Sequence, residues 1–229
     1  MKNAIAILLS MILYCPYALA QSGRYGSNVF DHLLIKQEDP FHRLTPEDVE
    51  GSPYIHDSFF LSKVITTKGV FDSVPLRFDA NNGWMEFRRK GETFILDPLP
   101  EVMKIEMPAE TYTVEAFLDH GKPTLGFFVL LDTVKELKLL KMHEVKFQER
   151  IPPKALEARG KPATYIPSPD QFYYRFGFNP ALKIEKVSKM ADYIPTAYKK
   201  ELISCVKRKK PEVREEDLRK LWDYLKKTN

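Results

Sequence analysis

Between residues 59 and 150, hydrophobic and polar positions alternate in short runs that are typical of β-strands. The runs are rich in β-branched and aromatic residues and are separated by turn formers. The predicted strands are 59–66, 70–78, 84–89, 93–96, 102–107, 112–118, 125–131 and 137–147. Asn82-Gly83 and Lys90-Gly91 tolerate positive φ and predict hairpin turns. Because the links are too short for crossover helices, we expect an antiparallel sheet of consecutive hairpins.

An aromatic strand follows a proline-rich segment, residues 151–169, which we expect to run as an extended connection over the surface. In the range Phe172–Phe178, the even-numbered residues share one face of a strand, and Tyr173 and Arg175 share the other. A return run over 181–187 would close a hairpin. The even-numbered rings either line the core or form a platform for glycan or peptide. We favour the core, which leaves Tyr173 and Arg175 outside as candidate binding residues.

The hydrophobic spacing becomes helical near the C-terminus. The residues at helical spacing are Tyr198, Leu202 and Val206, and then Leu218, Leu221, Trp222 and Leu225. They predict two amphipathic helices that meet around Pro211 and form a hairpin over 196–229. Acidic residues at 215–217 and lysines at 226–227 suit the dipole of the second helix. We expect Trp222 to be buried against the first helix or the sheet.

The order of these elements predicts an α+β fold. A largely antiparallel β-domain over 59–187, as a curled sheet or small sandwich, would carry the helical hairpin on one end. Residues 21–58 show no sustained period and read as an irregular lead-in, with a short helical turn at Thr45-Pro46. No repeat of fixed period is visible, so one domain with a helical appendage is expected.

The first twenty residues have the pattern of a secretory signal. Lys2 precedes an apolar run over 4–13, and Ala18-Leu19-Ala20 forms a small-residue exit. A lipoprotein signal at Cys15 is the alternative, but the preceding Tyr14 is bulky where a small residue is needed. We therefore expect residues 1–20 to be cleaved and the protein to be periplasmic or secreted, without a transmembrane anchor.

Cleavage after residue 20 would leave Cys205 as the one thiol of the mature chain, so that no internal disulfide could form. Cys205 lies within an apolar stretch, residues 202–206, and a small buried hydrophobe is the interpretation we favour for it. A nucleophilic cysteine would need a histidine partner, and no histidine follows His143.

Charge is unevenly distributed along the chain. The formal net charge is +4, and residues 196–229 carry eleven Lys and Arg against six Asp and Glu. A basic helical face can contact phosphate or anionic glycan, or can simply be solvated. We therefore list four residues as candidate contacts to anionic lipid or lipopolysaccharide, and export disfavours nucleic acid as a partner. They are Lys207, Arg208, Lys209 and Lys210.

Recognisable catalytic motifs are absent from the sequence. His143-Glu144 begins H-E-x-x-H, but Phe147 replaces the second histidine. Asp79–Gly83 has oxygen ligands at alternate positions, yet a hairpin turn explains it better than a calcium loop. Neither a nucleophile elbow nor a phosphate-binding loop occurs, and we expect no cofactor or metal. Paired carboxylates for a hydrolase stay possible on or beside the strands, at Glu86, Asp97, Glu101, Glu106 and Glu115.

Several of these stretches together resemble an uncharacterised family of exported bacterial proteins of the Bacteroidota type. They are Gly51-Ser52-Pro53-Tyr54, residues 59–66, 74–78, 85–87, 96–98 and 104–105, and the Phe-Tyr-Tyr strand with two basic helices that ends near residue 225. Such proteins have no assigned activity, so the resemblance implies the fold and export but no site residues.

Three functions stay open at this point. We favour a noncatalytic binding or structural protein of the bacterial envelope or exterior, whose partner is an unknown envelope component, glycan or protein. The first alternative is a secreted hydrolase that acts on glycan or peptide through strand-borne carboxylates. The second is contact with anionic lipid or lipopolysaccharide through the basic C-terminal helices.

Overall fold

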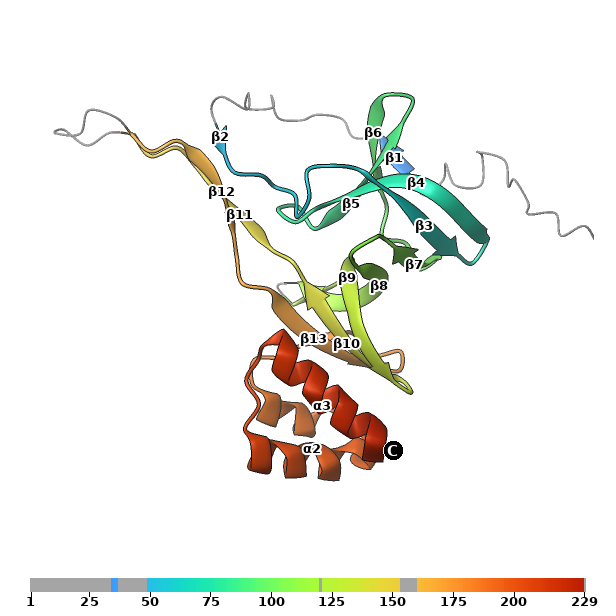
Figure 1. The fold of residues 1–229 in the computed structure, drawn as a ribbon, viewed down its shortest axis with the longest axis vertical. Helices are drawn as coiled ribbons and strands as arrows, with labels where there is room; N and C mark the ends of the chain where they lie inside the picture. Colours follow the sequence, from blue (N-terminus) through green and yellow to red (C-terminus); the bar gives the residue numbers. More distant parts are fainter. Residues whose placement is uncertain (1–33, 37–48, 120, 153–159, 229) are drawn as a thin grey trace, which may run out of the picture.

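The computed structural model describes residues 34–36, 49–119, 121–152 and 160–228. They form a strongly curled, eleven-stranded sheet with helices packed at one end (Figure 1). The strand order is β1-β6-β5-β4-β3-β7-β8-β9-β10-β13-β14, and neighbouring strands are antiparallel throughout. The predicted α+β fold, with a largely antiparallel sheet and a C-terminal helical hairpin, is confirmed. The predicted signal and the helical turn at Thr45-Pro46 lie outside the described residues.

The strands of the main sheet are β1 (Leu34–Lys36), β3 (Phe60–Thr66), β4 (Gly69–Asp79), β5 (Trp84–Arg89), β6 (Glu92–Leu96), β7 (Val102–Glu106), β8 (Thr111–Asp119), β9 (Lys122–Val134), β10 (Leu137–Met142), β13 (Gln171–Phe176) and β14 (Leu182–Lys183). A three-stranded sheet has the order β11 (Val145–Gln148), β12 (Ala163–Pro167) and β2 (Val49–Glu50). The helices are the 3₁₀ helix η1 (Val187–Asp192), α2 (Thr196–Lys209) and α3 (Glu215–Thr228).

The predicted hairpin turns are present. Gly83, with φ 73°, joins β4 to β5, and Lys90-Gly91, with φ 50° and 83°, joins β5 to β6. Asp79 holds the first turn because its Oδ1 accepts the backbone N–H groups of Asn81 and Asn82, both at 2.9 Å. Asp79–Gly83 is therefore a hairpin turn whose aspartate oxygens accept backbone hydrogen bonds, as the sequence favoured.

The expectation of consecutive hairpins is wrong at two places. β7 pairs with β3 instead of β6, because residues 97–101 carry the chain back across the sheet to the free edge of β3. The predicted single strand 137–147 is divided, because β10 ends at Met142 and β11, from Val145, belongs to the second sheet. The chain leaves the main sheet there as the β11–β12 ribbon, which projects away from the body (Figure 1), and then returns to pair β13 with β10. Both departures are long-range pairings, which residue spacing does not reveal.

Short strands lie in two segments that the sequence predicts to be irregular, the lead-in 21–58 and the proline-rich connection 151–169. β1 and β2 fall within the lead-in, and β12 falls within the proline-rich connection. β2 runs parallel to β12, the one parallel pair among the described strands. These strands have two to five residues and are fixed by their partners, so their local sequence carries no clear period of two.

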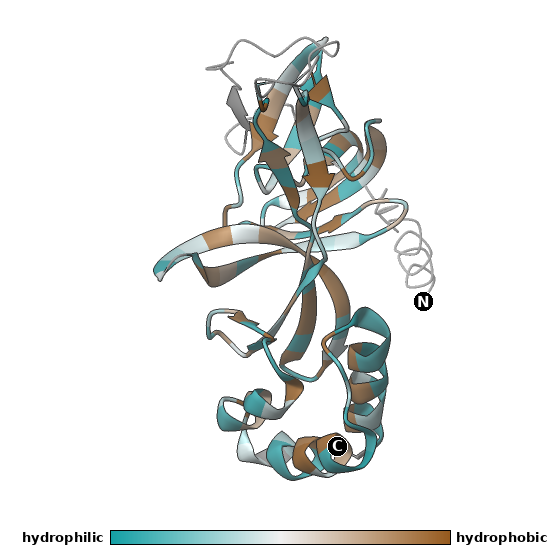
Figure 2. Ribbon diagram, turned by 90° about the vertical axis from the view of Figure 1, so that its left-hand side faces the viewer, coloured by the Kyte–Doolittle hydropathy of each residue, from teal (hydrophilic) through white to brown (hydrophobic). Residues whose placement is uncertain are grey.

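One face of the curled sheet packs against the helices. Leu202 of α2 and Leu218, Trp222 and Leu225 of α3 join one cluster with residues of the strands. Trp222 is fully buried, as predicted, and the free thiol Cys205 is buried in the same cluster. Figure 2 shows hydrophobic residues interspersed with hydrophilic ones along both helices, as amphipathic packing requires.

The opposite face of β8, β9, β10 and β13 is buried as well. Phe128, Leu140 and Tyr173 form a second cluster with Ala181, and the rings of Phe117, Phe128 and Tyr173 meet edge to face. The chain after β13 folds back over this face, and the Ala181 N–H donates to the Ala116 carbonyl at 2.6 Å. A small second core results.

This second core corrects two placements. Tyr173, expected outside, is only 7% exposed, because the face opposite the helices is also covered. Phe178, expected to share the core face with Phe172, is 99% exposed, because β13 ends at Phe176 and the turn begins at Gly177, with φ 53°.

No helix among the described residues is both long and apolar enough to cross a membrane.

Trp222→Ala should lower the free energy of unfolding by about 3 to 5 kcal/mol, since it removes the largest fully buried side chain. Urea denaturation of the wild type and the variant measures the difference. Tyr193→Ala, at an exposed aromatic position close to the same helices, should change stability little. Equal losses in the two variants would contradict the packing described above.

Candidate functional site

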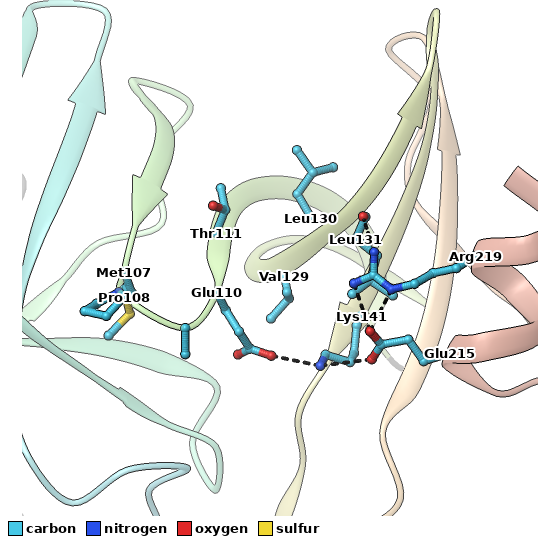
Figure 3. Close-up of a pocket in the computed structure, with 11 residues that line it drawn as sticks. Met107, Pro108, Glu110, Thr111, Val129, Leu130, Leu131, Lys141, Glu215 and Arg219 are labelled. Atoms are coloured by element: carbon cyan, nitrogen blue, oxygen red, sulfur yellow. Dashed lines mark hydrogen bonds and ion pairs between the residues drawn. The ribbon is translucent and has the colours of Figure 1, made fainter. Parts of the chain in front are cut away.

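A pocket of about 390 Å³ opens where the sheet meets α3 (Figure 3). We call it the junction pocket. Its lining consists of residues 107–111 in and beside the β7–β8 turn, residues 129–131 of β9, Lys141 of β10, and Glu215 and Arg219 of α3. The surface that lines the pocket is mainly polar, and Glu110, Lys141, Glu215 and Arg219 supply its charge.

Each charged side chain has a local reason for its position. Glu110 lies in a tight turn in which its carbonyl accepts the Met107 N–H at 3.0 Å. Lys141 points to the same face of β10 as Leu139, toward the helices. Glu215 occupies the first turn of α3, where the helix dipole favours an acid, and Arg219 follows one turn later.

These four side chains form a continuous chain of ion pairs, drawn in Figure 3. Lys141 Nζ lies 2.8 Å from Glu110 Oε1 and 3.3 Å from Glu215 Oε2, and it is only 9% exposed. Arg219 reaches Glu215 Oε1 at 2.8 Å. Lys141 thus sits between two carboxylates and ties the β7–β8 turn to α3.

A β-bulge in β9 completes the contact to α3. Leu139 pairs with Asp132 but Leu140 pairs with Leu130, so Leu131 has no partner on β10. Its carbonyl oxygen accepts a hydrogen bond from Arg219 at 2.8 Å. The bulge therefore frees the backbone group that receives the arginine of the helix.

His143 extends the charged chain on the side of the ribbon. It lies between β10 and β11, with Nε2 at 2.8 Å from Glu110 Oε2 and Nδ1 at 2.7 Å from Asp170 Oδ1. Its side chain is 10% exposed. With a carboxylate at each ring nitrogen, both nitrogens act as donors, which is the arrangement of a protonated imidazole.

The neighbouring charges lower the pKa of Glu110 and raise the pKa of His143. Burial by itself raises the pKa of Glu110, but the hydrogen bonds and charges of His143 and Lys141 outweigh it and hold that pKa at about 2. Burial lowers the pKa of His143, yet Glu110 and Asp170 raise it more, and the net shift is upward. Arg219 and Lys141 outweigh burial at Glu215, so its pKa is lowered as well.

This arrangement is poorly suited to acid–base catalysis. A general acid needs a carboxyl group with a raised pKa, whereas both carboxylates in the pocket have lowered ones. His143 has no free nitrogen to accept a proton, because each nitrogen already faces a carboxylate. What the pocket offers is a mainly polar surface with fixed charge of both signs, which suits binding of a polar or charged group.

The other candidate residues lie elsewhere. Arg175, with Lys138, contacts the fully buried carboxylate of Glu115. Tyr173 shares that face, which is turned away from the helices. Lys207 to Lys210 are exposed at the C-terminal end of α2. The structure therefore does not bring the predicted site residues together.

Sequence reasoning missed the junction pocket. Its charged residues come from positions 110, 141, 215 and 219, which only the fold brings together. One signal was available: Lys141 interrupts the apolar side of Leu137–Met142, where a buried charge needs a partner. In the sequence, His143 stands out only as the first half of an incomplete H-E-x-x-H motif. Within the described residues no group of three or more metal-ligating side chains is placed to hold a metal ion.

Comparisons with protein-family models, with curated proteins and with solved structures found no match. The geometry of the molecule is therefore the basis for any functional proposal.

His143→Gln should change how stability depends on pH. Because the pKa of His143 is raised on folding, its contribution is complete below about pH 6.5 and is lost as pH rises through the higher folded value. The difference in unfolding free energy between wild type and variant should be largest in acid and should narrow with rising pH.

Urea denaturation from about pH 5 to about pH 9 measures this difference, with His56→Gln as the control at an exposed histidine. A gap that stays constant over this range would contradict the charged contacts of His143. Below about pH 4.5 the wild type should lose stability further as Glu110, with a pKa of about 2, takes up its proton.

Proposed function

We propose that this protein is an exported, noncatalytic binding or structural module of the bacterial cell envelope or exterior. The observation that carries the proposal is the charge pairing of the junction pocket. Glu110 and Glu215 flank one buried lysine, so both stay ionised at neutral pH and neither serves as an acid. A preformed pocket with a mainly polar surface and fixed charges of both signs supports recognition of a polar envelope component, a glycan or a protein.

A hydrolase with strand-borne carboxylates is the weaker proposal. Glu86 and Glu115, the two buried residues among the candidate carboxylates, are each held by cations: Arg77 lies 2.5 Å from Glu86, and Lys138 lies 2.8 Å from Glu115. Neither carboxylate lines the junction pocket. Two buried acids that neutralise their own arginine and lysine partners support structural roles.

Export belongs to the proposal on sequence grounds. The charged start, the apolar run and the small-residue exit at residues 18–20 support a cleaved signal and a periplasmic or secreted mature chain. N-terminal sequencing of the protein recovered from the periplasm or medium of a bacterial host should read Gln21 first. Retention of the whole chain in the cytoplasm would contradict export.

The noncatalytic proposal is tested with the purified mature chain. We expect no hydrolysis of fluorogenic peptides or nitrophenyl glycosides. We also expect cosedimentation with isolated cell-wall or outer-membrane fractions. Lys141→Met should reduce the affinity about tenfold, because it removes the cation shared by Glu110 and Glu215 and leaves each carboxylate with one cationic partner, His143 or Arg219. Lys220→Met, which removes an exposed lysine paired with Glu216, is the matched control.

Turnover that disappears in Glu110→Gln and survives in Glu216→Gln would overturn the noncatalytic proposal. Lys141→Met must remain folded for the comparison, which its circular dichroism spectrum and unfolding midpoint report. A variant that unfolds is replaced by Arg219→Gln, which removes an exposed member of the same chain of ion pairs.

A second candidate function, contact with an anionic surface, is favoured by the end of α2. Lys207, Arg208, Lys209 and Lys210 are consecutive and exposed. Arg208 is tied to α3, because it donates to the Tyr224 hydroxyl at 2.8 Å. Lys207, Lys209 and Lys210 form no ion pair with a described residue, which leaves three cations available for phosphate.

Charge reversal of these four residues to Glu should abolish binding to vesicles that contain phosphatidylglycerol at low salt. Reversal of four exposed lysines outside α2 and α3, Lys122, Lys161, Lys183 and Lys186, gives the same net charge and should leave binding largely intact. Vesicle sedimentation at about 20 mM and about 500 mM salt measures both variants. Binding by the first variant, or wild-type binding that persists at high salt, would contradict an electrostatic contact.

A further inference from the structure

Two arginines and two aromatic rings alternate on the outside of β4 and β5. The guanidinium carbon of Arg77 lies 3.4 Å from the centre of the Tyr54 ring and 4.4 Å from the centre of the Phe59 ring. The guanidinium carbon of Arg88 lies 4.4 Å from the same Phe59 ring. Phe59 therefore contacts two cations, which would otherwise repel each other, and its ring faces attract both.

Arg77 donates its side-chain hydrogen bonds to groups of the protein. Arg77 donates through Nε and Nη2 to Glu86 Oε2, at 3.2 and 2.5 Å, and through Nη1 to the Asp57 carbonyl at 2.8 Å. Tyr54 closes this side, because its hydroxyl donates to Glu86 Oε1 at 3.2 Å. Arg77 and Glu86 thus satisfy each other, and they fix the segment before β3 against β4 and β5.

The side chain of Arg88, by contrast, forms no ion pair or hydrogen bond with a described residue. Arg88 is exposed near the end of β5, and no described carboxylate or carbonyl accepts a hydrogen bond from it. Stacking on Phe59 orders the guanidinium group but leaves the N–H groups in its plane free. An ordered arginine with free donors is prepared for a bidentate contact with a planar oxyanion.

The surroundings of Arg88 favour an anionic ligand that also carries apolar groups. Lys90 is exposed in the turn that follows, two residues after Arg88, and adds a second cation there. Leu76 pairs with Phe87, and by the same register Pro75 lies beside Arg88. Leu61, which is exposed, pairs with Pro75 on the next strand. An apolar strip therefore borders the cation.

We propose that Arg88 is an anion-binding residue, positioned by Phe59, that takes a carboxylate or phosphate group of an envelope polymer or lipid headgroup. The site is separate from the junction pocket and from the basic end of α2. Of the two arginines that contact Phe59, Arg88 is the one without an ion pair to a described residue. Phe59 acts as a positioning residue and need not touch the anion.

The experiment uses two probes that present the two sources of oxyanion. Sodium polygalacturonate carries carboxylates on a sugar polymer, and vesicles with phosphatidylglycerol carry phosphate at a lipid surface. We expect Arg88→Gln to weaken binding of the full mature chain to one of them about tenfold, as the loss of one charge-assisted bidentate contact implies. The probe that responds identifies the source of the anion.

Matched variants separate orientation from charge. Arg88→Lys keeps the charge but not the planar fork and should recover only part of the affinity. Phe59→Leu removes the stacking ring and should weaken binding while Arg88 remains. Arg150→Gln removes another exposed arginine, on the ribbon, and should have little effect. Thermal unfolding of each variant shows whether the fold is retained, and Arg88→Gln should keep the wild-type midpoint within a few degrees.

Wild-type binding to neither probe at low salt would overturn the proposal. Equal losses in Arg88→Gln and Arg150→Gln would also overturn it, because they would mean that general positive charge is sufficient. The variant with the basic end of α2 reversed should retain the Arg88-dependent part of the binding to polygalacturonate. Loss of all binding in that variant would assign the anion to the helix instead.

Discussion

Strands β9 and β10 have to bury both of their faces, and the remaining architecture depends on this requirement. Phe127 and Val129 point toward the helices, whereas Phe128 and Leu140 point the other way, and all four are buried. An antiparallel sheet usually leaves one face to water. Here η1, α2 and α3 cover the first face, and the chain after β13 returns to β8 to cover the second. The positions of the helices and of this returning segment therefore both follow from the burial of β9 and β10 on two sides.

Burial on both sides also determines how the strands carry charge. Strand residues that would be solvated on an ordinary antiparallel sheet become buried acids or lysines, which must be paired to be tolerated. Glu115 lies on the second face and meets Lys138 and Arg175, while Lys141 lies on the first face and meets Glu110 and Glu215. Each buried charge on the two faces is therefore paired with side chains from other elements, and these ion pairs favour one arrangement of those elements.

Much of the fold could be predicted from local sequence, because turns and helices depend on local chemistry. Gly83 adopts the positive φ expected of the Asn82-Gly83 turn, and the helical spacing of Leu218 and Trp222 is confirmed. The apolar run 125–131 indicated a strand, but a run without alternation does not say what covers each face. The burial of Tyr173 and the exposure of Phe178 therefore escaped a reading based on alternation alone.

The site was less predictable than the fold because its contacts span the chain. Glu110 and Glu215 meet through Lys141 only after β7 pairs with β3 and α3 docks on the bulge at Leu131. Exposed cations such as those at the end of α2 can be predicted from the sequence, because they need no partner from a distant part of the chain. The physical division is therefore between charges that the fold neutralises, which explain stability, and cations such as Arg88 that it orders without neutralising. The Phe59 ring attracts the Arg88 cation and offsets part of the conformational freedom that ordering removes. Since no described carboxylate neutralises this cation, its charge stays available to an external anion.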